Sequence, residues 1–317
     1  MINRRNFLKN TSLLAAGGFL AGNTISACTE AKAAKNFGLQ TYSLTVNGDD
    51  REFSDNVADG LKRVAALGYV TIELAGYNNG KINGVDMQEY KKMAEDAGLK
   101  ITSTHVNPPV REYTQENKAT IAEFWKKAVD DHAAIGCKYI IQPGQPATRT
   151  IEEVAFVGEV FNEAGRIAKA AGLIFGYHNH AGEFERVSSE NAEPVQAGPG
   201  GGGGRRGARG QLIYNLMLQG TDPEFVVFEN DVYWTVMGQN DPVAYMKNFP
   251  DRIRLLHIKD RAVLGETGMM NFQKIFETAY ANNISDFFVE LEGYSGGTQF
   301  EGVKGCADYL LNAPFVK

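Results

Sequence analysis

Short apolar runs alternate with longer amphipathic stretches along most of this chain. Each run holds four to seven mainly branched or aromatic residues, the length of a buried strand. The stretches between the runs repeat apolar residues at helical spacing. We expect eight strands, at Phe37–Ser43, Val70–Leu74, Lys100–His105, Tyr139–Gln142, Leu173–His178, Phe225–Asp231, Ile253–Lys259 and Asp286–Glu290. We expect the helices that follow them at Asp55–Leu67, Asp86–Ala97, Glu116–Ile135, Ile151–Ala171, Gln211–Gln219, Asp241–Phe249, Asn271–Asn282 and Thr298–Leu311.

Glycine separates several of these helices from the strands that follow. Gly68, Gly98, Gly136 and Gly172 stand at such junctions, where a left-handed helix stop is easy for a residue without a Cβ. Strands that alternate with helices predict a parallel sheet. Eight such units predict a single-domain α/β fold, a (β/α)₈ TIM barrel over residues 36–317. A doubly wound open sheet is the alternative, but no GxGxxG turn follows the first strand.

The first 35 residues carry features of an export signal. Arg4-Arg5 precedes an apolar region, Thr11–Gly22, that is too short to span a bilayer. Ile25-Ser26-Ala27-Cys28 then resembles a bacterial lipobox. These features predict a signal peptide over residues 1–27, a lipid on Cys28 as the only membrane contact, and a polar tether over residues 28–35. The protein would be an exported lipoprotein, periplasmic or on the cell surface; an ordinary signal peptide with an incidental cysteine is the alternative.

Charge and cysteine content narrow the classes of function. The predicted signal holds Arg4, Arg5, Lys9 and no acid, so its removal changes the formal net charge from −6 to −9. An acidic surface repels phosphates, which disfavours a nucleic acid partner. The other two cysteines, Cys137 and Cys306, lack zinc-site spacing and are expected to be buried thiols.

A glycine- and arginine-rich insertion at residues 197–210 interrupts the connection between the fifth and sixth strands. Its composition is that of a flexible segment. Arg205, Arg206 and Arg209 could form a cationic lid over the barrel mouth. The alternative, which the ordering cost of polyglycine favours, is an insertion with no role.

Metal-binding side chains stand at the ends of the last four expected strands. They are His178 and His180, then Asp231, then His257, and finally Glu290 and Glu292. Since strand side chains two apart share a face, His178 lies beside His180, Asp231 beside Glu229, His257 beside Lys259 and Glu290 beside Glu292. The strand ends of a parallel barrel converge at its C-terminal mouth. Two imidazoles and two carboxylates there suit one divalent ion of Mn²⁺, Co²⁺, Zn²⁺ or Fe²⁺.

The strand motifs resemble the xylose isomerase-like barrel superfamily of sugar isomerases, epimerases and dehydratases, which also contains a type of AP endonuclease. The resemblance covers nearly all of residues 36–317 and is carried by "GLQTYSL", "GYVTIELAGY", "ITSTH", "GYHNHAGEF", "FENDVYW", "LLHIKD" and "FFVELEG". It implies one metal ligand from each of strands five to eight, here His178, Asp231, His257 and Glu290. The choice of Glu290 over Glu292 rests on this resemblance.

The first ligand departs from the commoner family pattern. Many sugar epimerases of the superfamily carry glutamate there and use it as one of two proton carriers, whereas this chain has His178. His180 could replace that carrier, or could instead hold the substrate. The resemblance implies proton abstraction beside a sugar carbonyl, with His180 or Glu290 as base and Lys259 stabilising oxyanion charge. Residues expected to bind the sugar are Glu73, His105, Gln142, Trp234 and Lys259.

These expectations define a function and its alternatives. Export and the absence of a phosphate-binding glycine loop favour an unphosphorylated sugar or glycoside as the small-molecule partner. The reaction would be isomerisation, epimerisation or β-elimination from a 3-keto-glycoside. A non-catalytic sugar-binding lipoprotein is a further alternative. A phosphodiesterase like the AP endonuclease is disfavoured by the acidic charge and by only five histidines.

Overall fold

A computed structural model describes residues 35–46, 52–191 and 210–317. The expected signal peptide and Cys28 lie outside the described residues. So do the expected tether, apart from Lys35, and the expected insertion, apart from Gly210. Among the described helices, none has the length and apolarity to cross a membrane.

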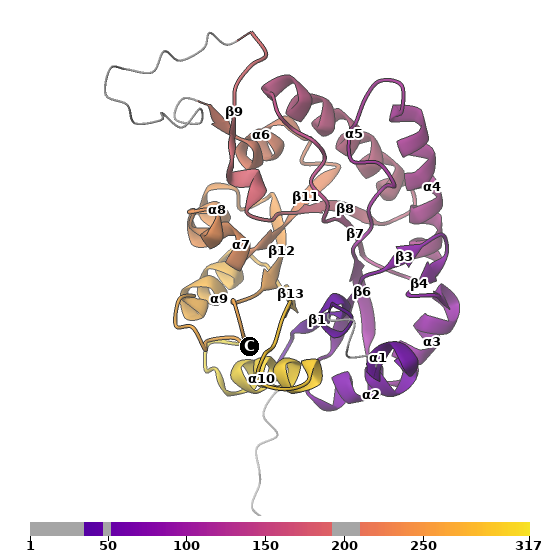
Figure 1. Ribbon diagram of the computed structural model, residues 1–317, viewed down its shortest axis with the longest axis vertical. Coiled ribbons are helices and arrows are strands. Elements are labelled where there is room, and N and C mark those ends of the chain that lie inside the picture. The colour runs from indigo at the N-terminus through magenta and orange to yellow at the C-terminus, as the bar shows by residue number, and fades with distance from the viewer. Residues whose placement is uncertain (1–34, 47–51, 192–209) are drawn as a thin grey trace, which may run out of the picture. The chain divides into compact units, whose positions relative to one another are not determined.

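Eight parallel strands form a barrel, which confirms the predicted (β/α)₈ fold (Figure 1). The sheet order runs from β6 through β2, β1, β13, β12, β11 and β8 to β7. The barrel closes between β6 and β7, where Lys138 N donates to Thr102 O at 3.0 Å and Val106 N donates to Ile141 O at 2.8 Å. In chain order the strands are β1 (Gly38–Gln40), β2 (Thr71–Leu74), β6 (Lys100–Thr104), β7 (Tyr139–Gln142), β8 (Ile174–His178), β11 (Val226–Asp231), β12 (Ile253–Ile258) and β13 (Asp286–Val289).

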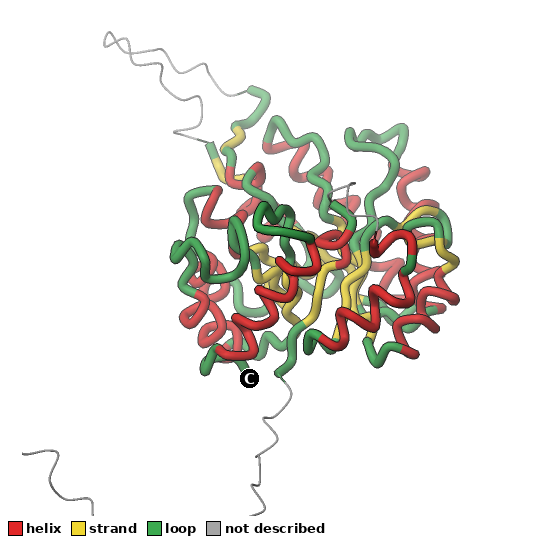
Figure 2. Tube along the Cα trace, turned by 60° about the horizontal axis from the view of Figure 1, so that its bottom comes forward, coloured by secondary structure: helices red, strands yellow, loops and turns green. Residues whose placement is uncertain are grey.

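Helices surround the strands, as the turned view shows (Figure 2). The main ones are α2 (Val57–Ala66), α3 (Met87–Asp96), α4 (Lys118–Ala134), α5 (Ile151–Ala170), α6 (Ile213–Gly220), α8 (Pro242–Asn248), α9 (Phe272–Ala281) and α10 (Gln299–Asn312). Short elements that the pattern did not predict are α1 (Glu52–Asp55), α7 (Val232–Met237), η2 (Gly182–Phe184), a three-stranded sheet of β3 (Tyr77–Asn78), β4 (Lys81–Ile82) and β5 (Val85–Asp86), and the pair β9 (Arg186–Val187) and β10 (Gln211–Leu212).

Local sequence signals account for the helix ends. Thr298 forms a capping box with Glu301 at the start of α10, and the Thr150 side chain accepts from Glu153 N at the start of α5. The predicted left-handed stops are confirmed, since Gly68 and Gly172 have φ of 97° and 82°. Gly98 and Gly136 share this conformation.

The first strand is shorter than predicted. It ends at Gln40 rather than Ser43, because residues Thr41–Leu44 turn into the 3₁₀ helix η1. The Gln40 side chain explains the turn: its Oε1 accepts from Tyr42 N at 3.0 Å, while its Nε2 donates to Glu73 Oε2 at 2.7 Å. The helix expected at Gln211 begins two residues later, because Gln211 and Leu212 pair with β9.

The inward-facing residues of the barrel change character along each strand. An apolar cluster of Tyr139, Ile141, Val227, Leu255 and Phe288 fills one level. Two residues after Val227, Leu255 and Phe288, at the same face, the side chains are ionisable: Glu229 on β11, His257 on β12 and Glu290 directly after β13. An apolar layer therefore fills part of the barrel interior, and the buried ionisable groups lie beyond it, towards the C-terminal mouth.

Candidate metal centre

Four side chains converge at the C-terminal ends of the last four barrel strands. His178 and Asp231 are the final residues of β8 and β11, His257 lies on β12, and Glu290 directly follows β13. Each is at most 5% exposed. One nitrogen or carboxylate oxygen from each lies within 4.8 Å of the others. The structure therefore brings together the quartet that the sequence and the family resemblance named.

The atoms of this quartet fit a cation. Asp231 Oδ2 lies 3.8 Å from His257 Nδ1 and 4.0 Å from His178 Nε2, while His257 Nδ1 lies 3.4 Å from Glu290 Oε2. Asp231 Oδ2 and His257 Nδ1 are both buried, and neither has a hydrogen-bond partner among the residues that the structure describes. Native proteins rarely leave buried polar atoms unpartnered, and coordination to one ion would satisfy both. Burial also raises the pKa of Asp231 to about 7, so a nearby positive charge would stabilise its carboxylate.

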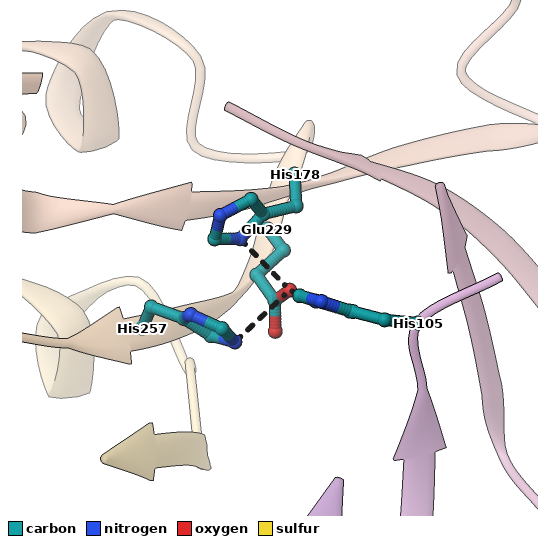
Figure 3. A group of neighbouring side chains, drawn as sticks. All are labelled: His105, His178, Glu229 and His257. Carbon is teal, nitrogen blue, oxygen red and sulfur yellow. Dashed lines mark hydrogen bonds and ion pairs between the residues drawn. The ribbon is translucent and has the colours of Figure 1, made fainter. Parts of the chain in front are cut away.

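A second layer of ionisable groups lies beside the quartet (Figure 3). Three imidazoles point at the Glu229 carboxylate, whose Oε2 is 2.9 Å from His105 Nε2, 3.2 Å from His178 Nδ1 and 3.4 Å from His257 Nε2. Glu73 Oε2 lies 2.6 Å from His257 Nε2 and 3.1 Å from His105 Nε2. We call Glu73, His105 and Glu229 the inner layer.

The inner layer determines which ring nitrogens face the quartet. His257 Nε2 donates to Glu73 and His178 Nδ1 donates to Glu229. The opposite nitrogens, His257 Nδ1 and His178 Nε2, are those directed at Asp231. Ligating histidines commonly donate their other N–H to a carboxylate in this way, which fixes both tautomer and ring orientation. His105, His178, Glu229 and His257 also satisfy the distance criterion for a metal group. Within this second group, His105 and His178 are hydrogen-bonded to Glu229, which is the arrangement of residues that orient metal ligands.

The two carboxyl groups of the inner layer, Glu73 and Glu229, have pKa values shifted in opposite directions. Burial alone would raise the pKa of Glu73, but the positive charges of His105 and His257 outweigh it and lower that pKa. Burial, and then repulsion by Glu73, raise the pKa of Glu229 to about 7. Burial lowers the pKa of His105 less than the nearby Glu73 and Glu229 raise it, so that the net shift is upward. The His105 ring therefore lies between two carboxylates, each of which favours its protonated form.

Lys259 connects the quartet to the mouth. Its Nζ donates to Glu290 Oε2 at 2.8 Å and contacts Glu292 Oε1 at 2.5 Å. The Glu290 side chain is 6% exposed and also faces His257, whereas the Glu292 side chain is 36% exposed. Burial opposes the charge of Lys259, but Glu290, Asp231 and Glu292 together raise its pKa, which keeps it an ammonium ion.

His180 and Trp234 stand at the edge of the site. The His180 ring centroid is 4.9 Å from His178 and 5.9 Å from Trp234, and its ring makes no hydrogen bond within the described residues. Burial lowers the pKa of His180 to about 4, which leaves the imidazole neutral. Trp234 N donates to Asp231 Oδ1 at 2.8 Å at the start of α7, and its indole Nε1 is buried with no hydrogen-bond partner in the described part of the chain. The Lys259 ammonium lies 5.1 Å from the Trp234 ring.

The residues expected to bind sugar occupy different depths. Glu73 is 0% exposed and bonds His257, while the His105 ring packs against His178 and His257 at centroid distances of 4.9 Å and 5.1 Å. Both residues therefore contact the candidate ligand histidines. Gln142 accepts from Tyr113 Oη at 3.0 Å and donates to Gly144 O at 2.9 Å, and it lines a cavity at the mouth together with His180. Glu229 was not among the predicted site residues. Its position two residues before Asp231 was the available signal.

Comparisons with known proteins agree with this architecture. The model of the family described as xylose isomerase-like TIM barrel matches residues 61–197. Two solved structures of sugar phosphate isomerase/epimerases from Parabacteroides distasonis ATCC 8503 are 51% and 46% identical, with TM-scores of 0.80 and 0.83. They cover 89% and 91% of this chain, and in each case this chain covers the whole of the relative.

More distant relatives include other sugar-modifying enzymes. An inosose dehydratase from Geobacillus kaustophilus is 23% identical over 217 residues, and the match spans 63% of this chain and 60% of that protein. The 3-keto-D-glucoside 4-epimerase of E. coli shares the fold, with a TM-score of 0.64 at 14% identity over 88% of this chain and all of that one. Because 51% identity extends over an entire relative, this chain belongs to the sugar phosphate isomerase/epimerase family of xylose isomerase-like TIM barrels.

Proposed function

We propose that this protein is a divalent-metal-dependent enzyme that removes a proton beside the carbonyl of an unphosphorylated sugar or glycoside. The observation that carries the proposal is the quartet of His178, Asp231, His257 and Glu290 with two unpartnered atoms turned towards one another. An ion held there would polarise the substrate carbonyl and stabilise negative charge on its oxygen.

The chain's own residues supply the proton transfers. His180 lines the cavity beside the quartet and its ring is not hydrogen-bonded, so it can accept the α-proton. Glu290 is the alternative base: its Oε2 accepts from Lys259, and its Oε1 has no hydrogen bond within the described residues and can take up a proton. The Lys259 ammonium can stabilise developing oxyanion charge or return a proton. The buried, unpartnered indole N–H of Trp234 is available to a sugar hydroxyl.

Three outcomes share this first step. Return of the proton to a neighbouring carbon isomerises the sugar, and return to the opposite face epimerises it. In a 3-keto-glycoside, loss of the C2 proton can instead form a C1–C2 double bond while the C1–O bond breaks and the aglycone oxygen takes up a proton. We propose isomerisation or epimerisation first, in line with the family, and elimination as the alternative.

We propose further that the protein is exported and lipidated on Cys28, because the twin arginines, apolar region and lipobox stand in the required order. An exported enzyme would meet few sugar phosphates, which supports an unphosphorylated substrate. Metabolic labelling with a radioactive fatty acid should label the full chain and not the Cys28→Ser variant. Equal labelling of both would remove the lipoprotein proposal.

Solvent exchange tests the proposed reaction. The metal-loaded protein, incubated in D₂O with 3-keto-glycosides or free ketoses, should place deuterium at the carbon beside the carbonyl, as followed by NMR. The matched control is Asp231→Asn, which retains an oxygen for the Trp234 N–H but removes the charge. Exchange with an intact glycosidic bond indicates an isomerase or epimerase, and exchange with release of the aglycone indicates a lyase. Metal binding without any deuterium exchange would refute the proposed enzymatic activity and favour the alternative of a non-catalytic sugar-binding lipoprotein.

A further inference from the structure

Two adjoining cavities lie at the barrel mouth, and the first of them is next to the metal centre through His180. The first has a volume of about 500 Å³ and includes Gln142 and His180, the latter in contact with the ligand His178. The second has a volume of about 370 Å³ and reaches outward to Ala147 and Ile213. Both are lined by Arg111, Gln145, Pro146 and Gly182, so they form one continuous groove.

The groove has the chemistry of a carbohydrate subsite. The Asn107 carbonyl accepts from Gly144 N at 2.8 Å and the Gln145 amide donates to Thr148 Oγ1 at 3.0 Å. The other ends of these amides, Asn107 Nδ2 and Gln145 Oε1, make no hydrogen bond within the described residues, which leaves one donor and one acceptor for hydroxyl groups. Three prolines give the first cavity rigid apolar walls: Pro108, Pro143 and Pro146.

The charge in the groove does not suit a phosphate. Arg111 is exposed and has no ion pair within the described residues, and it is the only cationic side chain among those lining the two cavities. The second cavity also contains Glu185, which would repel a phosphate. A neutral ring with several hydroxyls matches two free amide ends and one guanidinium better than a dianion does.

We infer that the groove binds the second ring of a glycoside while the reacting ring lies at the metal centre. The inference rests on the proposed function and narrows its substrate class to glycosides with a sugar-sized aglycone. A free ketose would occupy the end of the site at His180 and leave the second cavity unused. The combined groove is in the size range of sites that bury larger ligands, about 300–1,000 Å³.

Ala147→Trp tests the groove, because Ala147 lines only the outer cavity and lies outside the metal quartet. For the metal-loaded variant we expect KM for a 3-keto-disaccharide to rise about tenfold or more, because the second ring loses its binding site. KM for a methyl 3-keto-glycoside, which has no second ring, should change little. The matched control is Ala170→Trp, an exposed position at the end of α5. Arg111→Gln is a second variant that introduces no bulk and should raise the same KM.

A binding measurement separates this inference from the proposed function. NMR titration of the metal-loaded protein with an unoxidised glucose disaccharide, which cannot react, should show binding that Ala147→Trp weakens. Absence of exchange on any keto-sugar together with disaccharide binding would refute the proposed reaction but retain the groove. Unchanged disaccharide binding and KM in both variants would overturn the groove. Tighter binding of a hexose phosphate than of the disaccharide, lost in Arg111→Gln, would overturn it as well.

Discussion

His257 Nε2 lies 2.6 Å from Glu73 Oε2, and this single hydrogen bond turns the other ring nitrogen, Nδ1, towards Asp231 and Glu290. The two residues are 184 positions apart in the chain and lie on β12 and β2. Because a barrel brings strands from distant parts of the sequence to one mouth, a carboxylate early in the chain fixes the tautomer of a histidine near its end.

Glu73→Gln should weaken metal binding. The amide remains close in shape to the carboxylate but is a weaker acceptor for the His257 N–H, so we expect about 10- to 100-fold lower affinity. Competition with a chelator measures it, and Glu89→Gln, an exposed position on α3, is the matched control. We also expect one ion per chain. Two ions in the unmodified protein, with one lost in the variant, would show that the inner layer is itself a ligand set.

His132 predicts a pH dependence of stability that is independent of the metal centre. Its ring is 0% exposed; Nδ1 donates to Ala128 O at 2.6 Å and Nε2 accepts from Thr104 Oγ1 at 3.1 Å. Burial lowers its pKa from 6.5 to about 4. The folded state therefore favours the neutral ring, and this contribution, present above pH 6.5, is lost as the pH falls towards 4.

Urea unfolding of the metal-free protein at pH 7.5 and 4.5 measures this loss. His132→Asn keeps an N–H near the Nδ1 position but does not titrate. The unmodified protein should lose about 2–3 kcal/mol more than the variant between the two pH values. Carboxylates of the metal centre titrate in both proteins and cancel in the comparison. If the unmodified protein and the variant lose the same free energy of unfolding, His132 is protonated with little cost in the folded state.

Gly165 should not tolerate a methyl group. It lies on α5, and a Cβ there would be 2.3 Å from the backbone oxygen of Phe225, which cannot rotate away. We expect Gly165→Ala to lower the free energy of unfolding by about 1–3 kcal/mol, since α5 would be pushed off the start of β11. Gly220→Ala, at the end of α6, meets nothing within 4 Å and should change stability by less than about 0.5 kcal/mol. Equal stability of the two variants would contradict this packing.

The sequence was sufficient for the order of the elements and for the strand ends that carry ionisable groups. Alternating apolar runs identified all eight strands, and side chains two apart placed His178, Asp231 and Glu290 on inward faces. The depth of a side chain in the barrel could not be predicted. Glu73 lies on β2 and His105 directly follows β6, but the level that each occupies depends on the stagger of neighbouring strands.

Side-chain interactions that override the local sequence pattern could not be predicted from the sequence either. Gln40 ends β1 early because its amide bonds both Tyr42 N and Glu73, a residue on the next strand. The close approach of Gly165 to Phe225 depends on how α5 packs against β11, and nothing local to either segment signals it. Pattern thus gives the faces of elements, whereas the distances between faces come from tertiary packing.

Lys259→Met should separate catalysis from metal binding. Methionine fills much of the same volume, but the two carboxylates that Lys259 holds, Glu290 and Glu292, lose their cation. If the ammonium stabilises oxyanion charge in the transition state, kcat for deuterium exchange falls by about 100-fold or more, because removing one such donor typically costs that much. Metal affinity and KM change far less, since Lys259 is not one of the four ligand residues. This pattern is the opposite of that expected for Glu73→Gln, which loses affinity for the ion but recovers activity when the ion is in excess.

Lys247→Met, an exposed position on α8, is the matched control for loss of a lysine charge. An unchanged kcat in Lys259→Met, with the ion bound, would assign Lys259 a purely structural pairing role and leave the stabilisation of charge to the metal quartet alone.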